Sequence, residues 1–249
     1  MDKDNIVIQL ENVCFSYPNA WPVLDGLDFK IGQGEKLGLI GSNGSGKTTF
    51  LHIIMGLLSA SSGTVRIFGK AIETERDFRK VREKVGFVFQ NADDQLFSPT
   101  VLEDVAFGPL NLGKKPEEAR KMSLETLEAL NLNGFEDRVT YKLSGGEKKL
   151  VALATVLVMK PDVLLLDEPT IGLDEDTNKR IIDILNSLDI SYVIVSHEYD
   201  FLALTTHDIY AMQGGKILYN GRSESLHSHY HKHPNGKSRH THSYLERRP

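Results

Sequence analysis

The segment that most constrains the fold is the nine-residue stretch Gly41–Thr49, which reads GSNGSGKTT. It lies between the apolar run Leu37–Ile40 and the helix-like run Phe50–Leu58. The segment fits the pattern G-x-x-x-x-G-K-[ST], which forms a phosphate-binding loop when a strand precedes it and a helix follows it. Both flanking patterns are present, so the chain is predicted to fold around a strand–loop–helix unit that binds phosphate.

The residue types in this loop suit the phosphates of a nucleotide. Gly41, Gly44 and Gly46 can adopt positive φ and let the backbone close around an anion. Their N–H groups then point inward, at the positive dipole end of the following helix. Lys47 adds a full positive charge for the β- and γ-phosphates, and Thr48 supplies a hydroxyl ligand for magnesium.

Length and composition narrow the class of protein. A chain of 249 residues can form one α/β domain, with room for a small inserted subdomain. A formal charge of −5 argues against a general nucleic-acid binder, which needs a concentrated basic surface. Cys14 is the only cysteine, so no internal disulfide is expected and a reducing compartment fits. Neither a secretory signal nor a run of 18 apolar residues is recognised, so any membrane role is expected to depend on a partner.

Two alternating segments precede the loop. Ile6–Tyr17 and Val23–Ile31 alternate apolar and polar residues, which is typical of half-buried strands. They predict an antiparallel sheet that leads into the phosphate-binding strand. Two interpretations of Tyr17 stay open at this point: the ring packs against neighbouring residues, or it forms a platform on which adenine stacks.

The region after the compact strand Val85–Phe89 changes character. β-Branched residues become rarer, and Pro116 is well placed as a first helical residue ahead of an apolar stripe. We therefore predict a helical subdomain, about residues 91–160, inserted between strands of the core. Within it, Ser144 and Glu147 have the spacing of a helix capping box. The two glycines between them instead favour a bare helix start that binds a second anion, because glycine destabilises a helix.

Two buried-strand patterns end in candidate catalytic residues. Val163–Leu166 is an apolar run that ends in Asp167 and Glu168, and such a run predicts a parallel strand covered on both faces. Ligands of open α/β sheets bind at the carboxyl ends of the strands. Asp167 is therefore the candidate for positioning magnesium, and Glu168 is the candidate general base for a water molecule. His197 follows the next such strand and is either structural or catalytic, with its equivalent position favouring catalysis.

Seven elements now stand in order along the chain: Tyr17, GSNGSGKT, Gln90, LSGGE, LLLDE, Asp174 and His197. This order resembles the ATP-binding subunit of an ABC transporter, over about residues 5–222. The resemblance implies an α/β fold: a P-loop NTPase core with a mainly parallel sheet, an N-terminal antiparallel β subdomain and an inserted helical subdomain. It also implies an enzyme that hydrolyses ATP, with Mg²⁺ as cofactor, to ADP and phosphate.

The family gives each element a role. Tyr17 stacks on adenine, and Lys47, Gln90, Glu168 and His197 form the catalytic set. Thr48, Gln90 and Asp167 are the expected magnesium ligands. The resemblance also implies the residues that bind ATP, beginning with Tyr17. The phosphate-binding loop, called Walker A in this family, contributes Gly41, Ser42, Asn43, Gly44, Ser45, Gly46, Lys47, Thr48 and Thr49. The family signature contributes Ser144, Gly145 and Gly146, and the D-loop contributes Asp174.

The resemblance also implies partners and a location. A second ATPase subunit, an identical chain or a paralogue, forms a head-to-tail dimer in which Ser144–Gly146 of one subunit closes on the ATP of the other. Integral-membrane coupling and substrate-binding subunits complete the transporter, and the chain is peripheral on the cytoplasmic face of the cell membrane. No nucleic-acid partner is expected.

Within the family, Asn91–Phe97 and Thr100–Pro109 are similar to importers of the energy-coupling-factor type for cobalt, nickel and vitamins. In that type, the segment after Gln90 faces the membrane-embedded coupling subunit. Leu96, Phe97 and Phe107 either line a groove for a partner helix or belong to the subdomain core.

Histidine alternates with other residues near the C-terminus. Residues 1–222 are predicted to form the ATP-binding domain and residues 223–249 a flexible tail. His227, His229, His231 and His233 follow an H-x-H-x-H-x-H pattern that suits nickel or cobalt. We therefore predict a nickel or cobalt importer.

Three alternative functions stay open. The chain could serve an importer of a vitamin or another substrate. It could be a soluble ABC ATPase without a transport role, or a metal-storage or metal-chaperone protein.

Overall fold

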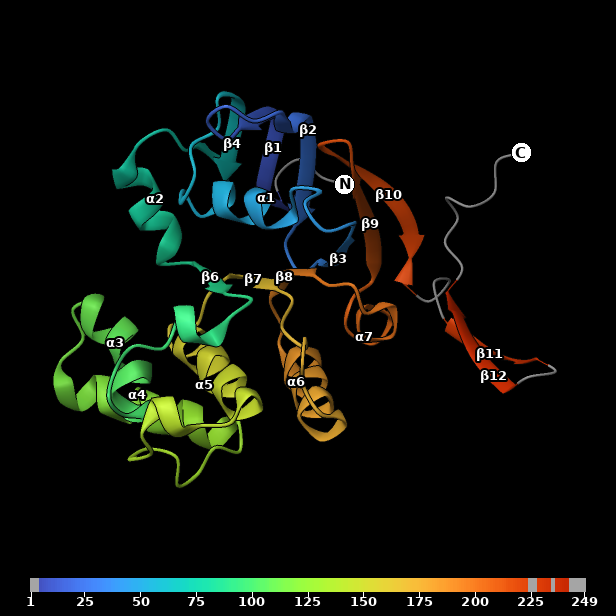
Figure 1. Ribbon diagram of the computed structural model, residues 1–249. Coiled ribbons are helices and arrows are strands. Elements are labelled where there is room, and N and C mark those ends of the chain that lie inside the picture. The colour runs from blue at the N-terminus through green and yellow to red at the C-terminus, as the bar shows by residue number, and fades with distance from the viewer. Residues whose placement is uncertain (1–4, 224–227, 234–235, 242–249) are drawn as a thin grey trace. The chain divides into compact units, whose positions relative to one another are not determined.

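The computed structural model describes residues 5–223, 228–233 and 236–241 (Figure 1). The chain divides into two compact units, which are described separately. One unit consists of Met1–Phe78 with Ser191–Pro249, and the other is Arg79–Ile190. Helix α2 (Glu75–Arg82) contains the boundary between them.

An antiparallel sheet forms the first layer of the first unit. Its strands are β1 (Ile6–Ser16), β2 (Pro22–Gly32), β4 (Ser62–Ile67) and β5 (Lys70–Ala71), in the order β2-β1-β4-β5. Buried and exposed positions alternate along most of β2, as expected for a sheet with one face in the core. The antiparallel pair predicted at the N-terminus is thus confirmed.

A second sheet of the same unit carries the phosphate-binding loop. Strand β3 (Lys36–Ile40) pairs in parallel with β8 (Ser191–Val195) on one side and β9 (Asp208–Gln213) on the other. Strand β10 (Lys216–Arg222) pairs antiparallel with β9. All five residues of β8 are buried, in agreement with the prediction of a strand covered on both faces.

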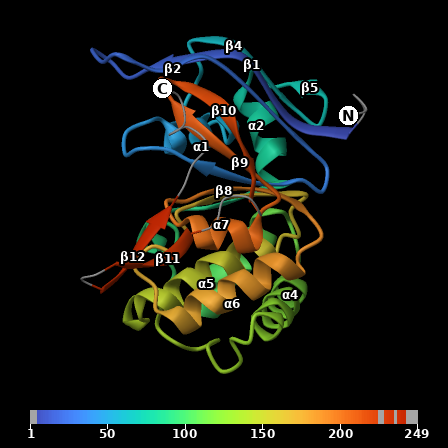
Figure 2. The same cartoon turned by 90° about the vertical axis from the view of Figure 1, so that its right-hand side faces the viewer.

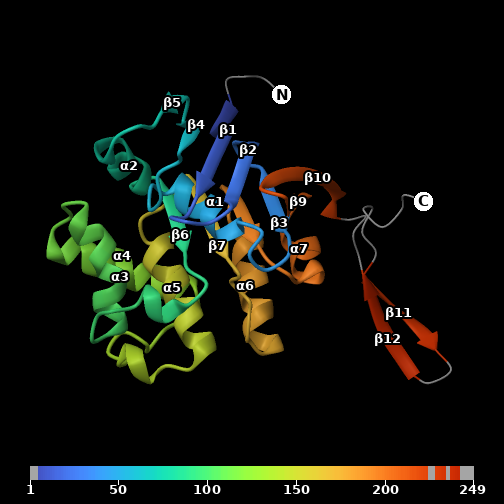
Figure 3. The same cartoon turned by 45° about the horizontal axis from the view of Figure 1, so that its top comes forward.

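Two helices flank these strands. Helix α1 (Lys47–Ile54) follows the loop and lies beside β1 and β2 (Figure 3), where the rings of Phe29 and Phe50 meet edge to face at 4.9 Å. Helix α7 (Tyr199–Thr205) follows β8. Its Leu202 approaches Gly38 so closely that an added Cβ would lie 3.1 Å from a Leu202 methyl. Packing in the core therefore fixes the positions of β3 and α1. The phosphate-binding loop, which connects these two elements, is held at both of its ends.

The second unit combines a parallel strand pair with helices. Strands β6 (Val85–Val88) and β7 (Val163–Asp167) pair in parallel, from Val85 opposite Val163 to Val88 opposite Leu166. The helical elements are η2 (Ala92–Asp94), α3 (Val101–Asn111), α4 (Pro116–Ala129), η3 (Thr140–Lys142), α5 (Gly145–Leu157) and α6 (Glu175–Ser187). Helices α5 and α6 lie side by side (Figure 2).

These elements agree with the predicted composition of the region. The predicted helical stretch, about residues 91–160, contains α3, α4 and α5, and Pro116 begins α4 as expected. The fold class is confirmed, because the chain contains an antiparallel sheet and parallel strands with helices. The boundaries of the subdomain and of the ATP-binding domain at residue 222 stay predictions.

The histidine-rich segment contains a hairpin. Strand β11 (Ser228–His233) pairs antiparallel with β12 (Gly236–Thr241), and His229 lies opposite His240 in the register. His229, His231 and His233 of the predicted metal-binding set lie in β11, while His227 lies outside the described residues. The flexibility predicted for the tail is not tested by this backbone arrangement.

Within the described ranges, the longest helices are too short or too polar to cross a bilayer. No group of three or more histidine, cysteine, aspartate or glutamate side chains is arranged to hold a metal ion among the residues that the structure describes.

Candidate nucleotide-binding site

The phosphate-binding loop has the backbone that the sequence predicts. Gly44 and Gly46 have φ angles of +76° and +105°, which other residue types rarely adopt. A Cβ on Gly46 would also lie 3.0 Å from the Val23 side chain, so a larger residue would be crowded here as well as strained. Gly46 is the N-cap of α1, so the loop leads directly into the positive end of the helix dipole, which favours anions.

Lys47 is held inside the loop. Its side chain is buried, and its ammonium donates hydrogen bonds to the carbonyl oxygens of Gly41 at 2.8 Å and Ser42 at 3.1 Å. The Nε2 atom of His197 lies 3.5 Å from the same ammonium. Because β3 and β8 are parallel neighbours, their carboxyl ends bring the loop and His197 together. The structure thus unites two residues that are 150 positions apart in the sequence.

Tyr17 packs against a neighbouring ring, and its role as an adenine platform stays a prediction. Its ring packs edge to face against Phe15 at 4.9 Å, and its hydroxyl lies 3.2 Å from the Thr49 hydroxyl. The side chain nevertheless remains 42% exposed. A packed ring with an accessible surface beside α1 is compatible with adenine stacking. Trp21, which is 90% exposed, lies in the same connection and was not singled out by sequence reasoning.

In the second unit, Gln90, Asp167 and Glu168 lie at the same ends of two parallel strands. Gln90 follows β6, and Asp167 ends β7. Asp167 and Glu168 are both buried, and Glu168 has a φ of +47°, in the left-handed region. Left-handed backbone costs about 1–2 kcal/mol for a residue with a Cβ, so surrounding contacts must hold Glu168 there. One such contact is the hydrogen bond from the Lys149 ammonium to the Glu168 carbonyl oxygen at 3.2 Å. The sequence had assigned Lys149 no role in the site.

The start of α5 corrects one argument from the sequence. The Ser144 side chain accepts a hydrogen bond from the Glu147 N–H, and Glu147 reaches back to the Ser144 N–H, so a complete capping box is present. A Cβ on Gly146 would lie 3.0 Å from the Thr177 hydroxyl, so packing against α6 explains this glycine within one chain. Gly145 is exposed, and a Cβ added to it would have no neighbour within 4 Å. Of the two glycines, only Gly145 still lacks a local explanation.

The acidic residues near this helix start also have structural partners. The Asp174 carboxylate caps α6 by accepting hydrogen bonds from the Thr177 N–H and hydroxyl at 2.9 and 3.0 Å. The backbone hydrogen bond from Thr177 lowers the pKa of Asp174 below its usual value. The hydrogen bond from the Ser144 N–H lowers the pKa of Glu147 in the same way. Both carboxylates therefore stabilise helix starts in their ionised form, and that stabilisation is lost as the pH falls through their lowered pKa values.

The segment after Gln90 divides between core and surface. Leu96 is buried and belongs to the core, whereas Phe97 and Phe107 are 66% and 45% exposed. The two phenylalanine rings meet edge to face at 4.7 Å. The buried Asp104 carboxylate accepts hydrogen bonds from the backbone N–H groups of Phe97 and Ser98. The exposed aromatic pair therefore stands on a fixed backbone.

Comparison with known proteins agrees with this geometry. The family model described as ABC transporter matches residues 24–171. This chain belongs to the ABC transporter ATP-binding family. The ATPase is 51% identical over 228 residues to a putative ABC transporter ATP-binding protein of Nitratidesulfovibrio vulgaris, covering 91% of this chain and 84% of that protein. It is 44% identical to an energy-coupling factor transporter ATP-binding protein, EcfA, of Methanothermobacter thermautotrophicus, covering 86% of this chain and 70% of the relative.

Solved structures give the same family for this ATPase. The cbiO1 protein of Clostridium perfringens, described as part of the ABC transporter complex cbiONQ, has a TM-score of 0.79 at 34% identity, covering 89% of this chain and 90% of that one. A dimeric ATP-binding cassette, MJ0796, bound to ADP and Pi has a TM-score of 0.77 at 29% identity, covering 84% and 96% of the two chains. The protein is thus an ABC ATPase, an ATP-hydrolysing transporter subunit of the energy-coupling type.

Proposed function

We propose that this ABC ATPase powers a membrane importer for nickel or cobalt ions. The observation that carries the proposal is the likeness to a cbiO protein and to EcfA proteins, together with the histidine-rich segment at residues 227–242. The closing and reopening of an ATPase dimer would drive the membrane subunits. The chain itself would be peripheral, at the cytoplasmic face of the cell membrane.

The proposed chemistry follows from the residues at the strand ends. Gly41–Thr49 binds the phosphates of ATP, and Lys47 and His197 contact the γ-phosphate. Glu168 accepts a proton from a water molecule whose oxygen attacks the γ-phosphorus, the bond to the β-phosphate oxygen breaks, and ADP and phosphate leave. No covalent intermediate is needed, because positioning and charge stabilisation are sufficient for phosphoryl transfer.

The available donors fit magnesium. Thr48 offers a hydroxyl, Asp167 a buried carboxylate and Gln90 an amide oxygen, and hard oxygen donors are the ligands that Mg²⁺ prefers. When bound, the ion would neutralise charge on the β- and γ-phosphate oxygens.

The remaining contacts to ATP would come from both subunits of a dimer. Tyr17 would stack on adenine. Ser144, Gly145, Gly146 and Asp174 would contact ATP held by a second ATPase subunit. Support for that arrangement comes from the exposed Ser144 and Gly145 at the start of α5.

The exposed aromatic pair, Phe97 and Phe107, is proposed to contact the membrane-embedded coupling subunit. Two adjacent exposed phenylalanines on a fixed backbone suit an apolar partner helix. The Phe97→Ser/Phe107→Ser double variant is expected to lose the integral-membrane subunits when the ATPase is purified from detergent-solubilised membranes. Leu204→Ser removes a 60% exposed leucine elsewhere and is expected to retain them.

The same purification tests the transported substrate when it includes metal analysis. The proposal predicts that the wild-type complex retains an integral-membrane partner together with nickel or cobalt. A complex that retains the membrane partner without either metal would contradict the metal assignment and favour a vitamin or other substrate. A wild-type protein that retains no membrane partner would contradict the transport function.

The histidine-rich segment is proposed to bind the same ions. The hairpin register places His240 opposite His229, so the predicted set His227, His229, His231 and His233 gains a neighbour from β12. Calorimetric titration with Ni²⁺ is expected to give at least about one more bound ion per chain for the full-length protein than for a chain ending at Arg222, because imidazole nitrogens bind Ni²⁺ well. Equal stoichiometry for the two proteins would contradict metal binding by the segment.

A further inference from the structure

Lys149 is a buried lysine in α5, whose other two charged residues, Glu147 and Lys148, are partly exposed. It lies in the second turn of α5, five residues after Ser144, and its side chain is 7% exposed. Lysine is among the residues least often buried, because taking an ammonium out of water is costly unless it is paired. Burial lowers the pKa of Lys149, while the nearby carboxylates of Asp167 and Glu168 act to raise it.

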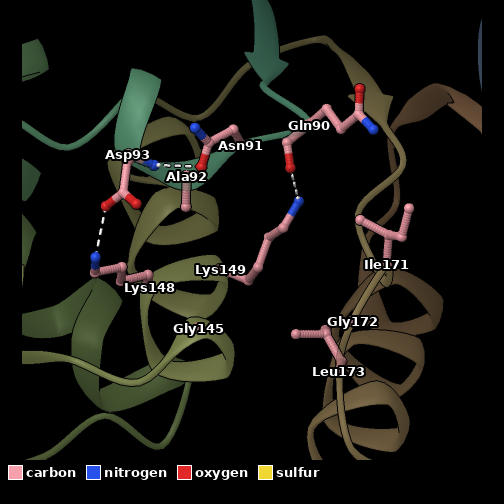
Figure 4. A pocket seen from close by; sticks show the side chains of 10 residues that line it. All are labelled: Gln90, Asn91, Ala92, Asp93, Gly145, Lys148, Lys149, Ile171, Gly172 and Leu173. Carbon is pink, nitrogen blue, oxygen red and sulfur yellow. Dashed lines mark hydrogen bonds and ion pairs between the residues drawn. The ribbon is translucent and has the colours of Figure 1, made fainter.

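The partners of the Lys149 ammonium are two backbone carbonyl groups. Nζ donates a hydrogen bond to the carbonyl oxygen of Gln90, as Figure 4 shows, and another to the carbonyl oxygen of Glu168 at 3.2 Å. Gln90 follows β6 and Glu168 follows β7, so one ammonium connects the ends of both strands to α5. A lysine ammonium has three donors, which allows it to hold both carbonyls at once.

These contacts act on the part of the backbone that aims two proposed catalytic side chains. Glu168 has a φ of +47°, which a residue with a Cβ adopts only when its surroundings enforce it. Fixing the Glu168 carbonyl fixes the peptide plane next to its Cα and therefore the direction of its Cβ. The carbonyl of Gln90 is held by the same atom. Small displacements of such side chains are costly, because an error of about 1 Å in a catalytic group can slow a reaction by about a hundredfold.

We propose that Lys149 is a positioning residue for ATP hydrolysis, which holds the main chains of Gln90 and Glu168 so that both side chains keep their catalytic orientation. This inference rests on the proposed roles of Glu168 and Gln90. It assigns Lys149 no contact with ATP or with the attacking water.

Lys148 provides a matched control within the same pocket of about 390 Å³. It is the preceding residue of α5, and its ammonium contacts the Asp93 carboxylate at 2.6 Å rather than a catalytic residue (Figure 4). Replacing either lysine with methionine removes one charge and keeps a similar length. If the two variants differ in ATPase activity, the difference is therefore due to the loss of the Lys149 hydrogen bonds to the two carbonyl groups and not to the loss of a charge.

The test measures kcat and KM for ATP in the full-length protein. Lys149→Met is expected to lower kcat at least about tenfold with KM changed less than about threefold, the pattern of a lost transition-state interaction. Lys149→Arg, which can donate to both carbonyls, is expected to recover kcat to within about threefold of wild type. Lys148→Met is expected to stay within about twofold of wild type, because its partner Asp93 is exposed and the ion pair holds neither Gln90 nor Glu168.

A double variant separates positioning from a general structural effect. In single-turnover assays, Lys149→Met is expected to cause little further loss when Glu168 is already glutamine, because the lysine acts through that side chain. Lys149→Gln, which keeps a donor, replaces Lys149→Met throughout if the methionine variant does not fold. The proposal is overturned if Lys149→Met matches Lys148→Met, if arginine restores nothing, or if the loss is equally large in the Glu168→Gln background. An active Glu168→Gln protein would instead refute the assignment of the base, so the two failures are distinguishable.

Discussion

The Glu168→Gln variant is expected to bind Mg-ATP with nearly wild-type affinity and to hydrolyse it at least about a hundredfold more slowly, the scale at which a general base contributes. Glutamine has almost the same shape as glutamate but cannot accept the proton that water loses. Glu168 is buried directly after β7, with its carbonyl held by Lys149, so the substitution should leave the backbone unchanged. Affinity is measured with a fluorescent ATP analogue and turnover by phosphate release.

Glu83→Gln is the matched control for this experiment. Glu83 is an exposed glutamate of the same unit, and its replacement removes one negative charge far along the chain from β7. The control is expected to hydrolyse ATP at the wild-type rate. If Glu168→Gln turns over ATP within about threefold of wild type, proton transfer to Glu168 is not part of the reaction.

Replacing Lys47 with alanine is expected to weaken ATP binding itself. In the structure the Lys47 ammonium is held by the carbonyls of Gly41 and Ser42, a position from which it can contact phosphate oxygens. A hydrogen bond to a charged group contributes about 1.5–3 kcal/mol, so the loss should raise the dissociation constant of ATP about ten- to a hundredfold. Equilibrium titration with the same fluorescent analogue measures this constant.

Lys70→Ala controls for the loss of a positive charge on the same unit, since Lys70 is an exposed residue of β5. It is expected to bind ATP as the wild type does. Unchanged affinity in Lys47→Ala would contradict the assignment of Gly41–Thr49 as the phosphate-binding loop. The two main variants should thus separate binding from hydrolysis: Lys47→Ala loses affinity, and Glu168→Gln loses turnover.

Features encoded by local sequence patterns could be predicted well. The apolar run before Gly41 and the glycines within the loop determine a strand and a left-handed turn, and both are present. The run Val163–Leu166 is buried on both faces, so continuous hydrophobicity correctly indicated a parallel strand. The meeting of His197 and Lys47 requires in addition that β3 and β8 are neighbours in the sheet, which the strand patterns alone did not give.

Features that depend on distant contacts could not be predicted. Lys149 lies in the polar sequence Glu-Lys-Lys, which reads as a solvent-exposed helix turn, yet packing buries it between two strand ends. The small size of Gly146 is favoured by its close approach to Thr177, a residue of another helix. In both cases the feature depends on a residue that is close in space but distant in the sequence, and neither hydrophobic periodicity nor composition indicates such a contact.

The segment after Gln90 is a second case in which the sequence alone did not determine which residues are buried and which are exposed. The sequence could not distinguish core from partner site for Leu96, Phe97 and Phe107, because all three are simply apolar. The fold divides them, burying Leu96 and leaving the two phenylalanines exposed. Hydrogen bonds from the Phe97 and Ser98 N–H groups to the buried Asp104 hold the backbone next to Leu96, and such contacts are not visible in the sequence.

The central claim is that this ABC ATPase forms one half of a clamp that closes on ATP. Light scattering during size-exclusion chromatography of the Glu168→Gln protein tests it most directly, because slow hydrolysis should preserve the closed state. The protein is expected to be a monomer without nucleotide, a dimer with Mg-ATP, and a monomer again when Lys47→Ala is added. A monomer under every condition, or a dimer that does not depend on ATP, would contradict it.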